Sequence, residues 1–438
     1  MKDGGRLQAA IEVLDDVEKR RRPLADALKD WGLSHRFAGS GDRNAIASLA
    51  FDALRRKASL AWIMADPSPR AAVLATWVQT WGRGIAGLEA ALADPHAPKP
   101  LGPTERKRLE ADPQTLLAEA PRHVRADWPE WLDASLGSLF GERSVEEGRA
   151  LAARAPVDLR VNTLKGTREE ALAALAHMGP VATTLSPTGL RLADGGPTAK
   201  APHVPSEAAY QDGLVEIQDE GSQLAALVAA PRKGSRILDL CAGGGGKSLA
   251  LAAAIADDGR IYAYDDDKRR FGDFRDRIAR AGATSIELRP PIGPDPLRDL
   301  VGTIDLVLVD APCTGTGTWR RRPDAKWRLR PNALADRMRD QDGVLDDAAR
   351  FAAPDARIVY VTCSILREED EDRVAAFLER HDGWHLVDPT TRLAPDLAEA
   401  LERFVTRDRP GTPALRLTPA TADTDGFFVA VLERGRPA

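Results

Sequence analysis

The sequence predicts an α/β protein whose C-terminal half is built on a doubly wound, mostly parallel sheet. Short apolar runs alternate with helical stretches from Arg236 onward, which is typical of strands covered by helices on both faces. A stretch rich in strand-like runs begins earlier, at Val157, whereas residues 1 to about 90 contain no convincing strand. We therefore expect an all-helical N-terminal part, a small α+β unit and the α/β core, in that order.

The N-terminal part is expected to be a small helical bundle. Apolar side chains recur at helical spacing in LQAAIEVL (7–14) and again in IASLAFDAL (46–54). Proline and glycine crowd residues 94–103, which indicates a linker or a surface crossing. A further helix is expected over 128–139.

The α+β unit begins with VDLRVNT, whose alternating apolar residues are typical of a strand. Residues 168–177 have a helical pattern, and two more strands are expected in VATTLSP and GLRLADG. The unit should end near residue 200.

The core strands are predicted in apolar, β-branched runs: RILDL, RIYAYD, SIELRP, IDLVLVDA and ARIVYVTCS. Helices are expected between most of them, over 248–256, 268–281 and 334–352. FFVAVLE, near the end of the chain, fits a closing strand.

The composition, with 43% hydrophobic and 29% charged residues, is typical of a soluble globular protein. No apolar run approaches the roughly 20 residues of a membrane span, and three cysteines argue for a reducing cytoplasm rather than a disulfide framework. The histidines are scattered, so we expect no metal site, and we expect a monomer. The net charge of −5 does not itself indicate nucleic acid, although basic clusters occur at 19–22, 55–57 and 320–322.

The stretch LDLCAGGGGKS (238–248) looks like a phosphate-binding loop but fails its pattern, because Cys241 occupies the place of the required first glycine. Its glycines follow a predicted strand and lead into a helix, where they let the backbone approach a ligand closely. The next strand ends at Asp265, about twenty residues beyond the loop, where a carboxylate accepts hydrogen bonds from ribose hydroxyls. Both S-adenosylmethionine and a dinucleotide suit this pattern.

Two of the three cysteines directly follow predicted parallel strands, Cys313 in DAPC and Cys363 in TCS. The carboxyl ends of such strands form the edge where doubly wound proteins place their sites. Together with Asp310, the two thiols suggest a nucleophile, a helper thiol and a carboxyl acid. This set suits base methylation, because cytosine C5 becomes nucleophilic only when a thiolate adds at C6. The residues alone do not decide which cysteine attacks.

Several stretches between about Leu159 and Gly435 carry a family resemblance: LRVNTLKGTREEAL, VEIQDEGSQLAA, LDLCAGGGGKS, VDAPCTGTGTWRRRPDAKWRL, VYVTCSILREEDEDRV and DGFFVAVLERG. In this order they are similar to the RsmB-type (Sun/Fmu) bacterial ribosomal RNA cytosine-5 methyltransferases, and residues 40–64 resemble the NusB-like helical domain of that subfamily. The resemblance implies a NusB-like RNA-binding domain with its linker at 1–140, an α+β RNA-binding module at 141–215 and a Rossmann-like methyltransferase core at 216–438.

The resemblance also implies the roles of the catalytic residues. Cys363 would attack C6 as a thiolate, and Cys313 would assist removal of the C5 proton and release of the enzyme. Asp310 would hydrogen-bond the cytosine ring at N3, and Lys247 would help to order the site. The cofactor S-adenosylmethionine would be bound by residues of the loop and of the strand ends: Asp239, Cys241, Ala242, Gly243, Gly244, Gly245, Gly246, Lys247, Asp265, Arg270 and Asp310.

The sequence departs from the family pattern at two places. Gly243 and Gly244 stand where the family usually has alanine and proline, and the lost rigidity predicts weaker cofactor binding. The acidic residue usual after the third core strand is replaced by RPPIG (289–293), with Asp295 beyond it.

RNA is the expected partner, most specifically small-subunit ribosomal RNA. The segment that begins at Pro312 and Cys313 is called the Pro-Cys loop below. Basic side chains just after it are expected to contact RNA phosphates: Arg320, Arg321, Arg322 and Lys326. Trp319 and Trp327 flank this cluster, and we expect Trp327 to pack in the interior. Transfer RNA is the alternative substrate, and a non-catalytic assembly factor is the alternative function. The NusB-like front argues against the first, and the two thiols argue against the second.

Overall fold

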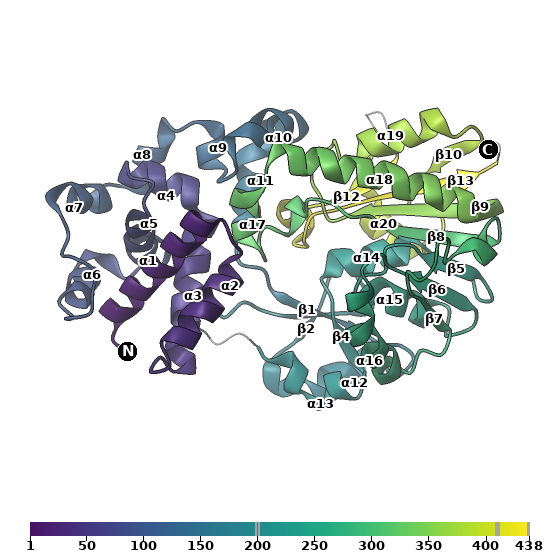
Figure 1. Cartoon of the computed structure of the whole chain (residues 1–438), viewed down its shortest axis with the longest axis horizontal. Coiled ribbons are helices and arrows are strands. Elements are labelled where there is room, and N and C mark those ends of the chain that lie inside the picture. Colours follow the sequence, from purple (N-terminus) through teal and green to yellow (C-terminus); the bar gives the residue numbers. More distant parts are fainter. Residues whose placement is uncertain (198, 200–201, 408–411, 436–438) are drawn as a thin grey trace. The chain divides into compact units, whose positions relative to one another are not determined.

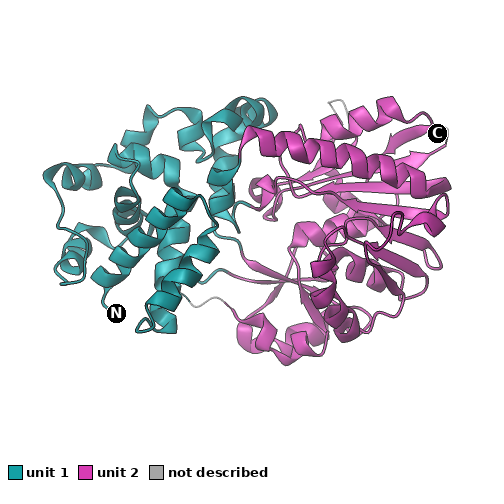
Figure 2. Cartoon of the chain, viewed as in Figure 1, with its two compact units in different colours: residues 1–155, 194–201, 319–329 teal, residues 156–193, 202–318, 330–438 magenta. Residues whose placement is uncertain are grey.

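The computed structural model describes all residues except 198, 200–201, 408–411 and 436–438. The chain forms two compact units (Figure 2). One comprises residues 1–155, 194–201 and 319–329, and the other comprises residues 156–193, 202–318 and 330–438. Residues 319–329, although they directly follow the Pro-Cys loop, thus belong to the first unit.

The first unit is helical throughout its regular structure. Its helices are α1 (Asp3–Arg20), α2 (Leu24–Ser34), α3 (Ser40–Arg55), α4 (Lys57–Met64), α5 (Pro69–Ala75), α6 (Gly84–Leu92), α7 (Pro103–Glu110), α8 (Pro113–Ala118), α9 (Arg122–Arg125), α10 (Asp133–Phe140), α11 (Ser144–Leu151) and α17 (Pro323–Arg328), with a π-helical turn at Thr76–Thr80. Leu7, Leu14 and Ile46 recur at helical spacing and are buried in one core. The expected helical bundle is confirmed, and it continues to Leu151, beyond the expected boundary at residue 140, because α11 packs against α9 and α10.

The second unit begins with a small antiparallel sheet of strand order β2-β3-β1-β4. Its strands are β1 (Val157–Val161), β2 (Val181–Ala182), β3 (Gly189–Leu192) and β4 (Val215–Ile217), and its helices are α12 (Arg168–Ala174) and α13 (Ala208–Gln211). Inward-facing residues such as Leu159, Leu190 and Val215 form its core. Strand β4 was not expected, because three residues carry too little periodicity to be recognised.

The larger sheet has the order β11-β12-β13-β9-β8-β5-β6-β7, with β10 paired to β13 (Figure 1). Its parallel strands are β5 (Arg236–Asp239), β6 (Arg260–Tyr264), β7 (Ile286–Arg289), β8 (Ile304–Asp310) and β9 (Ala352–Thr362). Antiparallel strands complete the other side: β10 (Trp384–Val387), β11 (Val405–Thr406), β12 (Ala414–Leu417) and the expected closing strand β13 (Phe427–Arg434). The doubly wound core is thereby confirmed.

Helices cover both faces of this sheet, because successive strand residues are apolar on both sides. Ile237 packs in a core with α14 (Glu220–Val228), α15 (Gly246–Ala254), α16 (Phe271–Ala281) and α20 (Pro395–Glu402). Its neighbour Leu238 faces a second core, formed with α18 (Pro331–Phe351) and α19 (Glu371–Arg380). A short helix, α21 (Pro419–Ala422), precedes β13.

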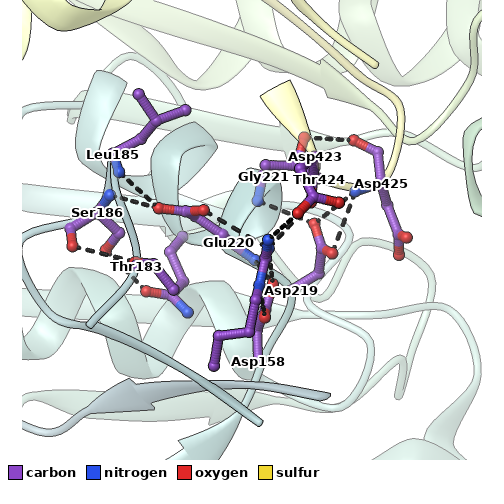
Figure 3. Close-up of polar contacts among 12 residues, drawn as sticks. Asp158, Thr183, Leu185, Ser186, Asp219, Glu220, Gly221, Asp423, Thr424 and Asp425 are labelled. Carbon is purple, nitrogen blue, oxygen red and sulfur yellow. Dashed lines mark hydrogen bonds and ion pairs between the residues drawn. The ribbon is translucent and has the colours of Figure 1, made fainter. Parts of the chain in front are cut away.

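Buried polar contacts fix the small sheet to the larger one (Figure 3). The carboxylate of Glu220, at the start of α14, accepts hydrogen bonds from the backbone N–H groups of Leu185 (2.8 Å) and Ser186 (2.7 Å). Arg191 on β3 donates to Asp158 on β1 at 2.7 Å and pairs with Asp423 near β13 at 2.6 Å. The small sheet and the core are therefore parts of one compact unit.

No helix among the described residues combines the length and the apolar character that a membrane crossing requires.

Candidate active site

The site lies at the carboxyl edge of the parallel strands. From β5 the chain continues to β6 and β7 on one side, and it then returns to β8 and β9 on the other side. The carboxyl ends of β5 and β8 flank this switch point, where ligands bind in doubly wound sheets. Asp239 ends β5 and Asp310 ends β8, and Cys363 directly follows β9. The fold thus brings three of the predicted site residues to one edge.

The loop between β5 and α15 has a conformation that requires glycine. Gly243 and Gly245 have positive φ angles of 54° and 82°. A Cβ atom on Gly245 would lie 1.9 Å from the ring of Phe274, so even alanine does not fit. The loop therefore presents bare backbone at the switch point.

Two elements outside the loop support its backbone. Arg277 on α16 donates to the carbonyl oxygen of Gly244, and Glu216 on β4 binds the same guanidinium at 3.0 Å. Arg160 on β1 donates to the carbonyl oxygen of Gly246 at 3.5 Å. These contacts brace the backbone where the family's usual proline is missing.

Asp265, after β6, is almost completely buried beside the loop. Its Oδ2 accepts from the N–H of Gly243 at 2.8 Å and from Arg270 at 2.9 Å. Its Oδ1 accepts from the N–H of Asp267 at 2.9 Å. The carboxylate is thus oriented by the loop and by the start of the next helix, as a ribose-binding acid must be.

Asp239 offers a buried acceptor that the protein itself does not fill. Ser248 donates to its Oδ2 at 2.5 Å, whereas its Oδ1 has no hydrogen-bond partner among the described residues. Burial raises the pKa of Asp239 to about 7, with Asp310 and Asp265 adding to the shift and the hydrogen bond from Ser248 opposing it. A ligand that donates a hydrogen bond would satisfy this oxygen, so the residues present fit a nucleoside-containing cofactor.

Lys247 connects the loop to Asp310, the candidate catalytic acid. Its Nζ donates to Oδ2 of Asp310 at 2.7 Å and lies 5.3 Å from the ring centre of Phe427. Burial opposes the charge of Lys247, but Asp310 and then Cys363 outweigh it and raise the pKa of the lysine above its ordinary value. Lys247 therefore remains a cation beside Asp310, whose side chain is 34% exposed toward the site.

The two catalytic cysteine candidates face each other. The Sγ atoms of Cys313 and Cys363 are 3.4 Å apart, although the residues are separated by fifty positions in the chain. The hydrogen bond with Cys363 and burial raise the pKa of Cys313 well above its ordinary value, so Cys313 stays a thiol in the resting site. The pair thus places two sulfur atoms side by side, as a nucleophile and a helper thiol would require.

Cys241, the third cysteine, is also kept neutral. Burial and then the nearby carboxylates of Asp239 and Asp310 raise the pKa of its thiol well above the ordinary value. It belongs to the wall of the loop rather than to the reacting pair.

The basic cluster after the Pro-Cys loop lies in the helical unit and is only partly exposed. Lys326 is 1% exposed and donates to the carbonyl oxygen of Arg55 at 3.0 Å, and Arg320 is 2% exposed. Burial lowers the pKa of Lys326 to about 8, although Asp127 opposes the shift. The expectation that all four side chains meet phosphates is wrong for this pair, because α17 packs against α3; Arg322 is exposed and Arg321 is half-buried. Trp327 packs with the helical core, as expected.

Sequence reasoning missed the residues that brace the two cysteines. Glu369 and Gln341 are fully buried and contact the chain next to Cys313. Glu369 lies in the acidic run EEDED, which is more typical of an exposed surface, so no local signal marked it. Within the described ranges, no group of three His, Cys, Asp or Glu side chains is arranged to hold a metal ion.

Comparisons with known proteins agree with this geometry. A model of the 16S rRNA methyltransferase RsmB/F family matches residues 226–433, and a model of the RsmF/B-like ferredoxin-like domain matches residues 128–199. The ribosomal RNA small subunit methyltransferase B of an Enterobacter species is 33% identical over 74% of this chain and 71% of that protein. A probable enzyme of the same name from Synechocystis is 30% identical over 70% of this chain and 67% of that protein.

The fold is also found in a solved structure. A methyltransferase homolog protein from Pyrococcus horikoshii has 24% sequence identity and a TM-score of 0.57, and the match covers 72% of this chain and 97% of that one. The doubly wound sheet, the glycine loop and the facing thiols define a group-transfer enzyme with a nucleoside cofactor. The chain belongs to the RsmB/F family of methyltransferases. It is thus an RNA methyltransferase whose methyl donor is S-adenosylmethionine.

Proposed function

We propose that this protein methylates C5 of a cytosine in small-subunit ribosomal RNA through a covalent bond between Cys363 and C6. The observation that carries the proposal is the 3.4 Å approach of the Cys313 and Cys363 sulfurs at the switch point. The named relatives act on small-subunit ribosomal RNA, which supports this substrate.

The cofactor supplies an electrophilic methyl group, and this chain supplies its binding site. We assign S-adenosylmethionine to the glycine loop, with Asp265 toward its ribose and the open Oδ1 of Asp239 toward a donor on the ligand. Arg270 holds Asp265 in place. Lys247 donates a hydrogen bond to Oδ2 of Asp310 and so orients this side chain at the border between cofactor and base.

The reaction divides into addition and elimination. The Cys363 thiolate forms a bond to C6, and the carboxyl group of Asp310, acting as a hydrogen-bond donor, shares its proton with N3 and so offsets the negative charge that develops there; the proton returns to Asp310 on elimination. The electron pair at C5 would then form a bond to the methyl group that bound S-adenosylmethionine supplies, and S-adenosylhomocysteine would be the leaving group. Cys313 first gives its thiol proton to solvent, and its sulfur then takes the C5 proton. The C5–C6 double bond re-forms as the bond from C6 to Cys363 breaks, and Cys363 leaves as a thiolate.

The RNA contacts proposed for the basic cluster are limited to Arg321 and Arg322. Both are accessible at least in part and directly follow the Pro-Cys loop. We further propose that the enzyme acts as a monomer without a metal, because one chain supplies the thiols, the acid and the cofactor loop. We also propose that it acts in the cytoplasm, where its three free cysteines would stay reduced.

Methyl transfer from labelled S-adenosylmethionine tests the proposal. Unmodified small-subunit ribosomal RNA and transfer RNA are incubated with the enzyme, digested to nucleosides and examined for 5-methylcytidine. We expect label in ribosomal 5-methylcytidine. Label only in transfer RNA would overturn the substrate, and no label with folded protein would favour a non-catalytic assembly factor.

Single cysteine variants separate the two thiol roles. Cys363→Ala should abolish transfer, because Cys313, the other thiol of the pair, cannot attack C6 from the position of Cys363. Cys313→Ala should accumulate a protein–RNA adduct that survives denaturation, because elimination is impaired. Full activity of Cys363→Ala would show that the nucleophile is assigned wrongly; melting temperatures of both variants control for folding.

A further inference from the structure

Glu369 is a buried carboxylate that contacts both cysteine-bearing loops. It lies in the turn between Cys363 and α19 and is 0% exposed. Its Oε1 accepts from the N–H of Thr314 at 2.8 Å, and its Oε2 accepts from the hydroxyl of Ser364 at 2.6 Å. Thr314 directly follows Cys313, and Ser364 directly follows Cys363, so one side chain joins the two segments.

Further donors complete this arrangement. The hydroxyl of Thr314 also donates to Oε2, and the amide of Gln341 on α18 donates to Oε1 at 3.0 Å. The same Gln341 amide donates to the carbonyl oxygen of Pro312 at 2.9 Å. Cys313 is thus held from both sides, through the residue before it and the residue after it.

The two loops also bond to each other directly. The N–H of Gly317 donates to the carbonyl oxygen of Cys363 at 2.9 Å, and the hydroxyls of Thr316 and Ser364 are 3.0 Å apart. Each of these contacts joins only one pair of groups. Glu369 differs from them because a single anion gathers donors from both loops and from α18.

We propose that Glu369 is a positioning residue that sets the distance and orientation of Cys313 relative to Cys363. The positioning of the two cysteines follows from the contacts of Glu369, whereas its effect on catalysis rests on the proposed function of the two thiols. Glu369 touches neither the base nor the cofactor in this scheme; it acts through Thr314, Ser364 and Gln341.

The chemistry of the contacts requires a carboxylate. All four groups around it are donors, and their hydrogen bonds favour the anion, although burial outweighs them and raises the pKa of Glu369 above its ordinary value. Glutamine would turn one acceptor into a donor and leave buried donors unpaired. The charge also matters for the thiol, because Glu369 adds to the effects of Cys363 and burial that keep the pKa of Cys313 high.

The test compares Glu369→Gln with Glu379→Gln, which removes the same charge from an exposed position on α19. Iodoacetamide is applied to the substrate-free enzyme over a range of pH, and alkylation of each cysteine is followed by mass spectrometry of its peptide. We expect Cys313 in Glu369→Gln to react faster at each pH and its midpoint to shift downward, because the nearby anion is lost. Glu379→Gln should behave like the unchanged protein.

Kinetics provide the second readout. A displacement of catalytic groups by about 1 Å costs about 10²-fold in rate, so kcat of Glu369→Gln should fall by this order while KM for S-adenosylmethionine changes little. Glu369→Asp should recover part of the rate, because it restores the anion. An unchanged alkylation profile in folded Glu369→Gln would overturn the proposal.

Thr314→Val decides the question if Glu369→Gln does not fold. It removes one donor to Glu369, keeps the backbone N–H and preserves the shape of the side chain. We expect a smaller change of the Cys313 profile in the same direction, and no change would again overturn the proposal. Because alkylation needs no RNA, a failure of the proposed function leaves this test intact, and a failure of this test leaves methyl transfer unaffected.

Discussion

At the scale of single residues, the site is governed by carboxylates that burial forces together. Asp239, Asp265 and Asp310 lie close enough to influence one another, and one buried lysine, Lys247, stands among them. Asp265 forms an ion pair with Arg270, and Asp310 forms one with Lys247, whereas the hydrogen-bond partner of Asp239 is the hydroxyl of Ser248. The ionised form of Asp239 is therefore disfavoured by burial and by the neighbouring carboxylates, and its pKa rises to about 7.

The raised pKa of Asp239 predicts a pH-dependent effect of Asp239→Asn on stability. In the unfolded chain Asp239 ionises near its ordinary pKa of 3.8, but in the folded protein it keeps its proton up to a pKa of about 7. The folded state binds more protons between these values, so the unchanged protein loses stability as pH rises through that range. At about 1.4 kcal/mol per pKa unit, the variant should gain up to roughly 4 kcal/mol relative to it by pH 8.

Thermal melting of both proteins between pH 4 and pH 8 measures this difference. The stability advantage of the variant should be near zero at the acid end and should grow toward pH 8. A difference that does not change with pH would contradict the raised pKa. Asparagine can still accept the hydrogen bond from Ser248, so the variant isolates the charge.

At the scale of elements, the glycine loop shows how a departure from the family pattern is accommodated. Gly243, at the family's alanine position, has a φ of 54°, a conformation that alanine adopts only with strain. Arg277 and Glu216 provide from α16 and β4 the support that a proline would give from within the loop. This external support offsets some of the lost rigidity. Weaker cofactor binding, which the sequence predicts, remains a prediction.

Gly245→Ala and Gly244→Ala form a matched pair that tests the loop. Alanine at 245 meets a positive φ and the Phe274 ring, so it should cost at least about 1–2 kcal/mol of folding free energy and weaken S-adenosylmethionine binding. Alanine at 244 meets only the flexible end of Arg277, at 3.2 Å, and should change both quantities little. Chemical denaturation and binding calorimetry measure them; equal effects of both variants would contradict the account.

At the scale of the whole molecule, the small sheet helps to hold the glycine loop in place. Arg160 on β1 donates to the carbonyl oxygen of Gly246, and Glu216 on β4 pairs with Arg277, which donates to Gly244. Arg191, Asp158 and Glu220 fix the two sheets together with buried charges (Figure 3). The small sheet, which the sequence predicts to bind RNA, thus also supports the glycine loop to which we assign S-adenosylmethionine.

Periodicity and motif spacing were sufficient to predict the doubly wound core and to place Cys313, Cys363 and Asp310 at one edge. They were sufficient because buried parallel strands are nearly all apolar and their carboxyl ends meet at that edge. The role of Glu369 and the burial of Lys326 were not predictable. Both depend on contacts between segments far apart in the chain, which no local pattern of charged residues records.

The most direct test of the central claim is to identify the cysteine that bonds to RNA. Small-subunit ribosomal RNA that contains 5-fluorocytidine should trap the enzyme, because fluorine at C5 cannot leave as a proton and elimination stops. After nuclease and trypsin digestion, mass spectrometry should find the modified nucleotide on the peptide 358–367, which contains Cys363. Attachment to the peptide 299–320, which contains Cys313, or methyl transfer without any adduct would contradict the account.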